Sequence, residues 1–226
     1  MTDNILPNYD LARLSAELAA VKRELEIETS VERVRGKAMA MRTSDDVCEV
    51  ICMAYNELNQ LSESLFWVSY YTYDPETREM TSWPQMLGQA TVRPFRMPRI
   101  DHPFHDRYID AFENQIPFYS YRLEGEGKAT CDPLLFSETD YKNMPDDMRE
   151  MMMSMTSIVS NNAVYRNSLL QAATTDELEP EAKALLERFV PMFDLTYIRS
   201  PKLPADRASG RIRGISMTRT KCSRSS

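Results

Sequence analysis

Two histidines lie close enough together in the sequence to share a ligand or a proton. His102 and His105 are the only histidines among the 226 residues, and imidazole is both a metal ligand and an acid–base group near neutral pH. A zinc site needs three or four ligands at close spacing, and no cysteine or carboxylate follows a recognisable ligand spacing around this pair. We therefore expect a structural or solvent-facing pair and no metal site.

The cysteines are the next reactive side chains, at Cys48, Cys52, Cys131 and Cys222. Cys48 and Cys52 are one helical turn apart on an apolar helix face, where thiols act as small hydrophobic side chains. Four cysteines in a chain of this length do not indicate a disulfide framework. We expect buried thiols that bind no metal and attach no cofactor.

Motifs of catalytic and nucleotide-binding sites are missing from the sequence. It contains no glycine-rich phosphate-binding loop, no nucleophile elbow and no metalloprotease signature. Gly125 and Gly127 are the one closely spaced glycine pair, and we expect it not to join a strand to a helix. The sequence therefore predicts no catalytic residues, no cofactor and no enzyme activity.

Aromatic side chains with polar edges form the best candidate for a ligand site. We expect them on one side of a sheet and on the segments that cover it, where such rings suit a small-molecule cleft. The candidate ligand-binding residues are Trp67, Tyr71, Trp83, Phe95, His102, Tyr108 and Tyr119. The simpler alternative is that these side chains only fill the core.

Hydrophobic periodicity places these residues in a mixed helical and stranded domain. Apolar residues at helical spacing predict helices over 44–61, 102–114, 145–155 and 179–197. Aromatic and β-branched residues predict strands over 65–73, 78–83, 91–97, 117–123, 157–165 and 168–173. We expect a polar loop over 124–128 and an irregular segment, with one helical turn at most, over 132–143. Hairpins of this kind indicate an α+β fold with a mostly antiparallel sheet, flanked by N- and C-terminal helices.

The N-terminal segment predicts a long helix with two apolar stripes. The first stripe has the alternating three- and four-residue spacing of a coiled-coil seam, and consists of Leu11, Leu14, Leu18, Val21 and Leu25. The phase then shifts, and the second stripe consists of Ile27, Val31, Val34, Ala38 and Met41. Such a shift resembles a stutter, which locally unwinds a coiled coil. We expect a homodimeric coiled coil, and the alternative is a single helix that lies on its own domain.

Charge is unevenly distributed along the chain. The formal net charge is −7, yet residues 200–226 hold seven basic residues and one acidic residue. The acidic remainder repels nucleic acid, so we expect no nucleic-acid partner. The basic segment lacks aromatic residues and periodicity, which predicts a disordered tail. No secretory signal and no apolar run of about 18 residues is present, so we expect a cytoplasmic protein without a membrane span.

Residues 30–47, SVERVRGKAMAMRTSDDV, resemble the segment that opens GAF-like sensory domains attached to bacterial histidine kinases and related signalling proteins. Looser similarity extends to His102-Pro103-Phe104, to Tyr141-Lys142-Asn143-Met144-Pro145 and to the segment 185–199. The resemblance covers about residues 28–199. It implies a helical signalling linker at 1–41, a GAF-like sensory domain at 42–199 and a basic tail at 200–226.

The resemblance also implies a function. Domains of this family are non-catalytic sensory modules of two-component phosphorelay systems, which sense a small molecule or a partner protein and dimerise through their flanking helices. In the family the closing helix continues into a kinase, whereas here a basic segment with prolines follows Arg199. We therefore expect a truncated or frameshifted part of a longer sensor kinase, without the kinase core. The alternative is a ligand-free scaffold domain for protein–protein interaction.

Overall fold

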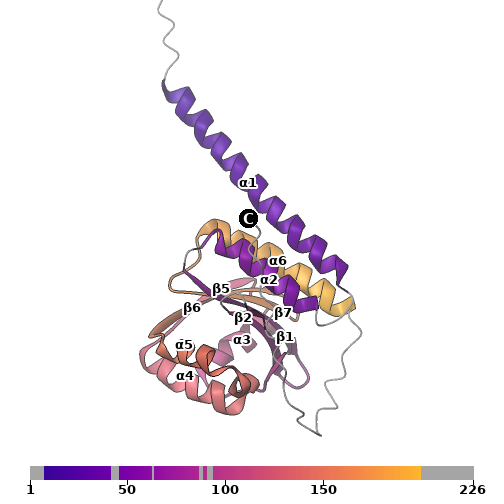
Figure 1. Cartoon of the computed structure of the whole chain (residues 1–226), viewed down its shortest axis with the longest axis vertical. Helices are drawn as coiled ribbons and strands as arrows, with labels where there is room; N and C mark the ends of the chain where they lie inside the picture. Colours follow the sequence, from indigo (N-terminus) through magenta and orange to yellow (C-terminus); the bar gives the residue numbers. More distant parts are fainter. Residues whose placement is uncertain (1–7, 42–45, 63, 87–88, 91–93, 200–226) are drawn as a thin grey trace, which may run out of the picture.

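The computed structural model describes residues 8–41, 46–62, 64–86, 89–90 and 94–199. It confirms the predicted α+β class, because an antiparallel sheet of seven strands lies between helices that include the long N-terminal and the C-terminal helix (Figure 1). The strand order is β3-β2-β1-β7-β6-β5, and β4 pairs with β2. The predicted tail at 200–226 and the first two residues of the helix predicted over 44–61 lie outside the described residues.

The observed elements follow the predicted order closely. The helices are α1 (Asn8–Ala40), α2 (Asp46–Asn59), α3 (Pro103–Glu113), α4 (Gly125–Glu138), α5 (Asp146–Ser154) and α6 (Pro180–Arg199), with a 3-10 helix at Asp140–Asn143. The strands are β1 (Leu65–Asp74), β2 (Glu79–Met86), β3 (Gln89–Ala90), β4 (Phe95–Met97), β5 (Phe118–Glu124), β6 (Ser157–Tyr165) and β7 (Ser168–Thr174). Of the strand predicted over 91–97, the structure contains β4, and residues 91–93 lie outside the described residues.

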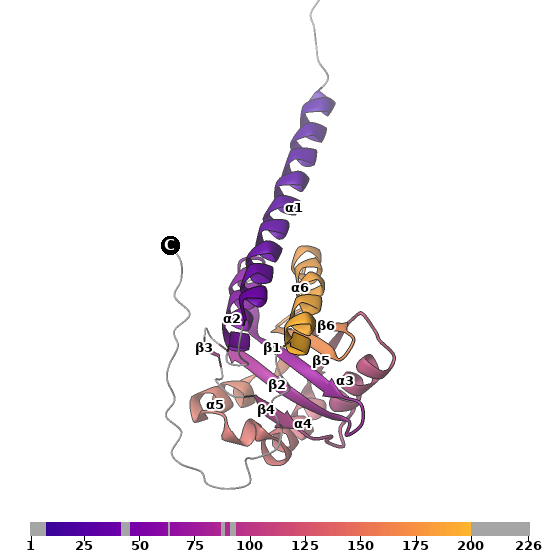
Figure 2. The same ribbon diagram turned by 90° about the vertical axis from the view of Figure 1, so that its right-hand side faces the viewer.

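The sheet is buried on both faces, because α2 and α6, with α1 packed against them, cover one side and α3, α4 and α5 cover the other (Figure 2). Side chains alternate between the faces along each strand. On β1, Val68 and Tyr70 therefore pack toward the terminal helices, whereas Trp67 and Tyr71 pack toward α3–α5. We call these the helix-side core and the cavity-side core. The central strands β1 and β7 consist almost entirely of buried residues, as a sheet covered on both faces requires.

Helix α1 uses its two apolar stripes for different purposes. The second stripe is buried in the helix-side core, where Ile27, Val31, Val34 and Ala38 are at most 6% exposed. The first stripe lies on the half of α1 that projects beyond the domain (Figure 1), and its five residues, Leu11 to Leu25, are 54–67% exposed. The phase shift in the sequence thus marks the point at which α1 leaves the domain.

The segment after β5 corrects the prediction made from the sequence. Residues 125–138 form helix α4 rather than a polar loop and an irregular segment, and Gly125 and Gly127 do follow a strand and open a helix. The buried positions of α4 have helical spacing, but two of the four are Lys128 and Asp132. A search for apolar periodicity misses a helix whose buried face is charged.

An ion pair between α1 and α2 fixes the buried half of α1. Glu57 is 6% exposed, and its carboxylate accepts two hydrogen bonds from Arg33, at 2.8 and 2.6 Å, and one from the Ser30 hydroxyl at 2.7 Å. Burial by itself raises the pKa of Glu57, but the hydrogen bonds from Arg33 and Ser30 outweigh burial and hold the pKa below its ordinary value. Glu57 is therefore ionised at neutral pH and depends on Arg33.

We expect Arg33→Met to lower the free energy of unfolding by about 2 kcal/mol at pH 7, because the buried carboxylate of Glu57 loses its cation. This loss is smaller than that of a fully buried ion pair, because the Arg33 side chain is half exposed. The loss should shrink below pH 4.5, where protonated Glu57 no longer needs a cation. Urea denaturation at several pH values measures it. Arg35→Met, which removes only an exposed pair with Glu32, is the control and should change stability by less than about 0.5 kcal/mol. Equal losses in both variants would contradict the assignment.

Candidate functional site

The cavity-side core contains a polar network in the middle of the sheet. Its centre is Gln171 on β7, whose amide oxygen accepts hydrogen bonds from the Trp67 indole nitrogen at 3.2 Å and from the Tyr71 hydroxyl at 3.1 Å. Its amide nitrogen donates to the Tyr108 hydroxyl at 2.5 Å and to the Ser160 hydroxyl at 2.6 Å. All four hydrogen-bonding positions of this amide are therefore used within the protein. The network connects three strands to α3.

A small cavity of about 50 Å³ lies between this network and helices α3, α4 and α5. Its wall combines aromatic rings, sulfur-containing and aliphatic side chains, one amide and one carboxylate. The lining residues are Trp67, Tyr71, Pro84, Met97, Phe104, Tyr108, Leu123, Cys131, Asp132, Leu135, Tyr141, Met152, Ile158 and Gln171. A wall that is mostly apolar with a few polar groups resembles the lining of small-molecule sites in composition.

Asp132 is the charged residue of the cavity wall, and α4 also supplies its counter-ion. Lys128 lies one turn earlier, 4% exposed, and its ammonium donates to Asp132 Oδ2 and to the backbone carbonyl of Met152 in α5, the latter at 2.8 Å. The pair thus neutralises a buried carboxylate and joins the two helices that close the cavity. An ion pair buried to this degree is costly to keep.

The other titratable groups of the wall are held in their neutral forms. Burial raises the pKa of Tyr71, Tyr108 and Tyr141 well above that of an ordinary tyrosine. Burial, with a smaller contribution from the neighbouring Asp132, raises the pKa of the Cys131 thiol to about 12. At neutral pH these groups donate and accept hydrogen bonds, but none is poised to transfer a proton or to act as a thiolate.

The two histidines take structural positions at the start of α3. His102 caps this helix, because its Nδ1 accepts a hydrogen bond from the Phe104 amide at 3.1 Å, and its Nε2 lies 3.2 Å from the Thr130 hydroxyl. His105 is 1% exposed, and neither ring nitrogen has a hydrogen-bond partner among the described residues. Burial lowers the pKa of His105 to about 4, so its ring is neutral at physiological pH.

The structure brings together part of the predicted ligand set. Trp67, Tyr71 and Tyr108 line the cavity. Phe95 belongs to the same core and packs edge-on against Tyr141, with 5.0 Å between ring centroids, but it does not line the cavity. Tyr119 is a neighbour of Tyr108 at 6.5 Å, again outside the wall, as is the helix cap His102.

Trp83 was expected on the same side of the sheet, and this prediction is wrong. It lies in the helix-side core, where its ring packs against Tyr70 with 5.4 Å between centroids. Met80 on β2 lies in the cavity-side core. Trp83 follows three residues later on the same strand, so its side chain points to the opposite face of the sheet. The register of the hairpin, which the sequence does not reveal, decides this placement.

Several residues of the site were not predicted. Gln171 lies in a strand that was correctly expected, and an amide in the middle of an apolar strand is a signal that could have found it. Asp132 and Tyr141 lie in the segment that was expected to be irregular, so nothing indicated that they face the sheet.

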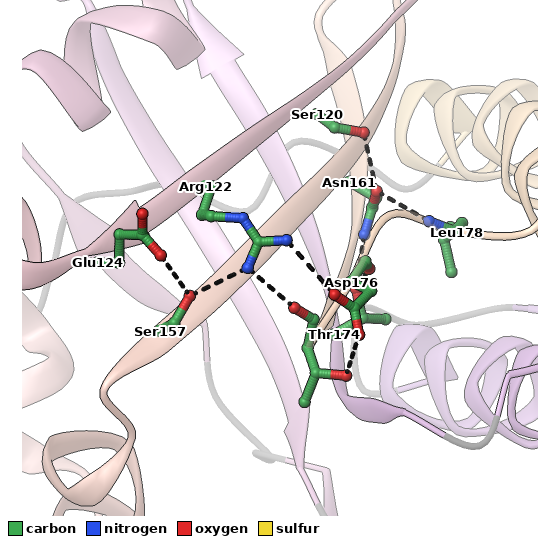
Figure 3. A network of polar contacts seen from close by, with 9 residues as sticks. Ser120, Arg122, Glu124, Ser157, Asn161, Thr174, Asp176 and Leu178 are labelled. Atoms are coloured by element: carbon green, nitrogen blue, oxygen red, sulfur yellow. Dashed lines mark hydrogen bonds and ion pairs between the residues drawn. The ribbon is translucent and has the colours of Figure 1, made fainter.

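The opposite face of the sheet holds a second polar network, at the entry to α6 (Figure 3). Asn161 on β6 donates to the Thr174 hydroxyl at 2.8 Å and accepts from the backbone amide of Leu178 at 3.3 Å. Arg122 on β5 donates to the carbonyl of Thr175 at 3.2 Å and to the carboxylate of Asp176 at 3.4 Å. The network ties the connection between β7 and α6 to β6 and to the edge strand β5.

No protein-family model matches the chain, and no curated protein matches it. The described residues hold no group of three or more His, Cys, Asp or Glu side chains arranged to bind a metal ion. None of the helices in the described part of the chain combines the length and the apolar character that a bilayer crossing requires.

His105 should make stability fall on acidification. Its pKa in the folded protein lies below the ordinary value of 6.5, so the unfolded chain takes up this proton more readily. The contribution of the neutral His105 ring to the free energy of unfolding is complete above pH 6.5 and is lost as the pH falls toward 4. Between pH 7 and pH 5 the natural chain should lose about 2 kcal/mol more than His105→Leu, as measured by urea denaturation. His102→Asn, which retains a helix cap, should keep the natural slope; a His105→Leu curve parallel to it would contradict the assignment.

Gln171→Met should lower the free energy of unfolding by about 3 kcal/mol, because the indole of Trp67 and the hydroxyl of Tyr71 lose their acceptor inside the core. Gln60→Met is the matched control on exposed surface and should change stability by less than about 0.5 kcal/mol. Equilibrium unfolding followed by tryptophan fluorescence measures both. A loss below about 1 kcal/mol for Gln171→Met would show that the network does not depend on this amide.

Proposed function

We propose that this chain is a non-catalytic, GAF-like sensory module of the kind found in bacterial histidine-kinase signalling, and that it dimerises through α1. The observation that carries the proposal is the division of α1 into two stripes. The stripe Ile27–Ala38 is buried against the domain, whereas the stripe Leu11–Leu25 is exposed on the projecting half. A helix built in this way connects a domain to a second helix. The resemblance of residues 30–47 to the opening segment of such modules supports the same conclusion.

The occupant of the exposed stripe is a second copy of α1. Leu11, Leu18 and Leu25 take the first core position of the heptad and Leu14 and Val21 take the second, which is the pattern of a two-helix seam. On the flanks, Glu17 and Lys22 are placed so that Glu17 of one copy lies near Lys22 of the other when the helices are parallel. An antiparallel pair would instead bring Glu17 and Glu24 of the two copies together. Charge thus favours the parallel dimer.

Strand β7 contacts both the cavity and the helix-side core beneath the terminal helices. Gln171 is in the cavity wall, and its neighbours Leu170 and Ala172 face the opposite way, into the helix-side core beneath α6. Helix α6 is in turn tied to α1, because Arg188 forms ion pairs with Glu24 at 2.7 Å and with Glu28 at 2.6 Å. A ligand that favours one arrangement of the cavity wall therefore biases the packing of both terminal helices.

A ligand-free interaction domain is the second candidate. Two observations favour it, since the cavity is only about 50 Å³ and Gln171 has no hydrogen-bonding position left for a ligand. In this case the polar network is structural, and α1 serves assembly alone. The two candidates share the dimer and differ in whether the cavity binds anything.

Leu18→Glu should convert the dimer to a monomer, because it places a carboxylate at the centre of the seam. The melting temperature of the domain should change little, since Leu18 is 56% exposed in the single chain. Sedimentation equilibrium of the full chain at several concentrations measures the association. Ala16→Glu, on the opposite side of the same helix, is the control and should remain dimeric. A natural chain that is monomeric, or a Leu18→Glu variant that remains dimeric, would overturn the dimer through α1.

A further inference from the structure

The cavity wall offers a ligand one charged group. All hydrogen-bonding positions of the Gln171 side chain are used by four residues, namely Trp67, Tyr71, Tyr108 and Ser160. Asp132 is different, because Lys128 bonds only to its Oδ2, and Lys128 itself is not part of the cavity wall. The wall therefore presents a carboxylate and no cation.

Aromatic rings line the same cavity as this carboxylate. Five rings contribute to the same wall, those of Trp67, Tyr71, Phe104, Tyr108 and Tyr141. Aromatic faces attract organic cations, and the attraction grows when the cation is shielded from water. An anion in the cavity would meet Asp132 with no compensating positive charge in the wall. The carboxylate and the aromatic rings thus favour a positively charged ligand over a negatively charged one.

We propose that the cavity binds a small organic cation, an alkylammonium, whose charged nitrogen lies against Asp132 and whose alkyl groups contact the aromatic rings. The proposal rests on the sensory function proposed above and names the class of ligand. One water molecule needs roughly 10–15 Å³ of such volume, so 50 Å³ admits a ligand of about three or four heavy atoms. Dimethylammonium and trimethylammonium fall in this range.

Lys128 is the internal competitor of this ligand. Its ammonium occupies Asp132 Oδ2 in the structure and also donates to the Met152 carbonyl of α5. A bound alkylammonium shares or replaces the bond to Asp132, while the bond to Met152 gives Lys128 a remaining acceptor. Ligand binding therefore changes the ion pair within α4, while the bond from Lys128 to α5 remains. Removing Lys128 should make Asp132 depend on the ligand as its only cation.

The experiment uses the full chain with three probes of four heavy atoms each and different charge, namely trimethylammonium, 2-propanol and acetate. Calorimetry and thermal unfolding should detect binding of trimethylammonium and not of the other two. Lys128→Met should bind trimethylammonium roughly tenfold more tightly, the worth of one charge-assisted hydrogen bond. The variant Lys128→Met with Asp132→Leu removes both charges, which buried pairs tolerate when replaced by apolar residues, and it should lose the binding.

The outcomes separate the class of ligand from the function. Equal binding of 2-propanol, binding of acetate, or a failure of both the natural chain and Lys128→Met to bind trimethylammonium overturns the organic cation. Retained binding in the double variant overturns the role of Asp132. Sedimentation of the same samples reports the α1 dimer independently, so a wrong ligand class leaves the dimer intact, whereas a monomeric natural chain refutes the dimeric module whatever the probes do.

Discussion

A single antiparallel sheet buried on both faces constrains everything else in this protein. Because side chains alternate along each strand, neighbouring residues of β7, and of β1 from Trp67 onward, face opposite cores. The cavity and the terminal helices are therefore separated by one layer of backbone. Gln171 faces the cavity while Leu170 and Ala172 support α6. No side chain can be displaced far on one face without moving the backbone that carries the other face, since interiors this closely packed transmit strain.

Helix α1 shows how sequence period and tertiary packing divide one helix into two parts. A straight helix with a constant seven-residue pattern would present one stripe to one partner. Here the stripe changes phase between Leu25 and Ile27, and burial changes with it, from 66% exposed to 6% exposed. Arg33, bonded to Glu57, and Arg188, bonded to Glu24, hold the helix on either side of this point.

The sequence predicted those elements whose burial is apolar and failed where burial is polar. The strands around Tyr71 and Gln171 and the helices around Ile51 and Phe189 were predicted because their apolar residues have strand or helix periodicity. Helix α4 was missed because Lys128 and Asp132 occupy its buried face. Three of the seven predicted ligand residues line the cavity, since aromatic composition indicates a site without fixing register. Trp83 shows the limit, because one residue of register moves a side chain to the opposite core.

These failures are concentrated around the cavity. In the middle of the sheet, the helix-side face consists of residues such as Val68, Tyr70, Leu170 and Ala172, whereas the cavity side has Gln171, and α4 adds a buried ion pair. An apolar pair of similar shape at Lys128 and Asp132 would serve folding at least as well. Polar and charged residues at buried positions lower stability, and proteins retain them mainly where function requires them. The buried charged residues of α4, which hid this helix from a prediction based on apolar periodicity, therefore include the carboxylate that makes the cavity prefer a cation.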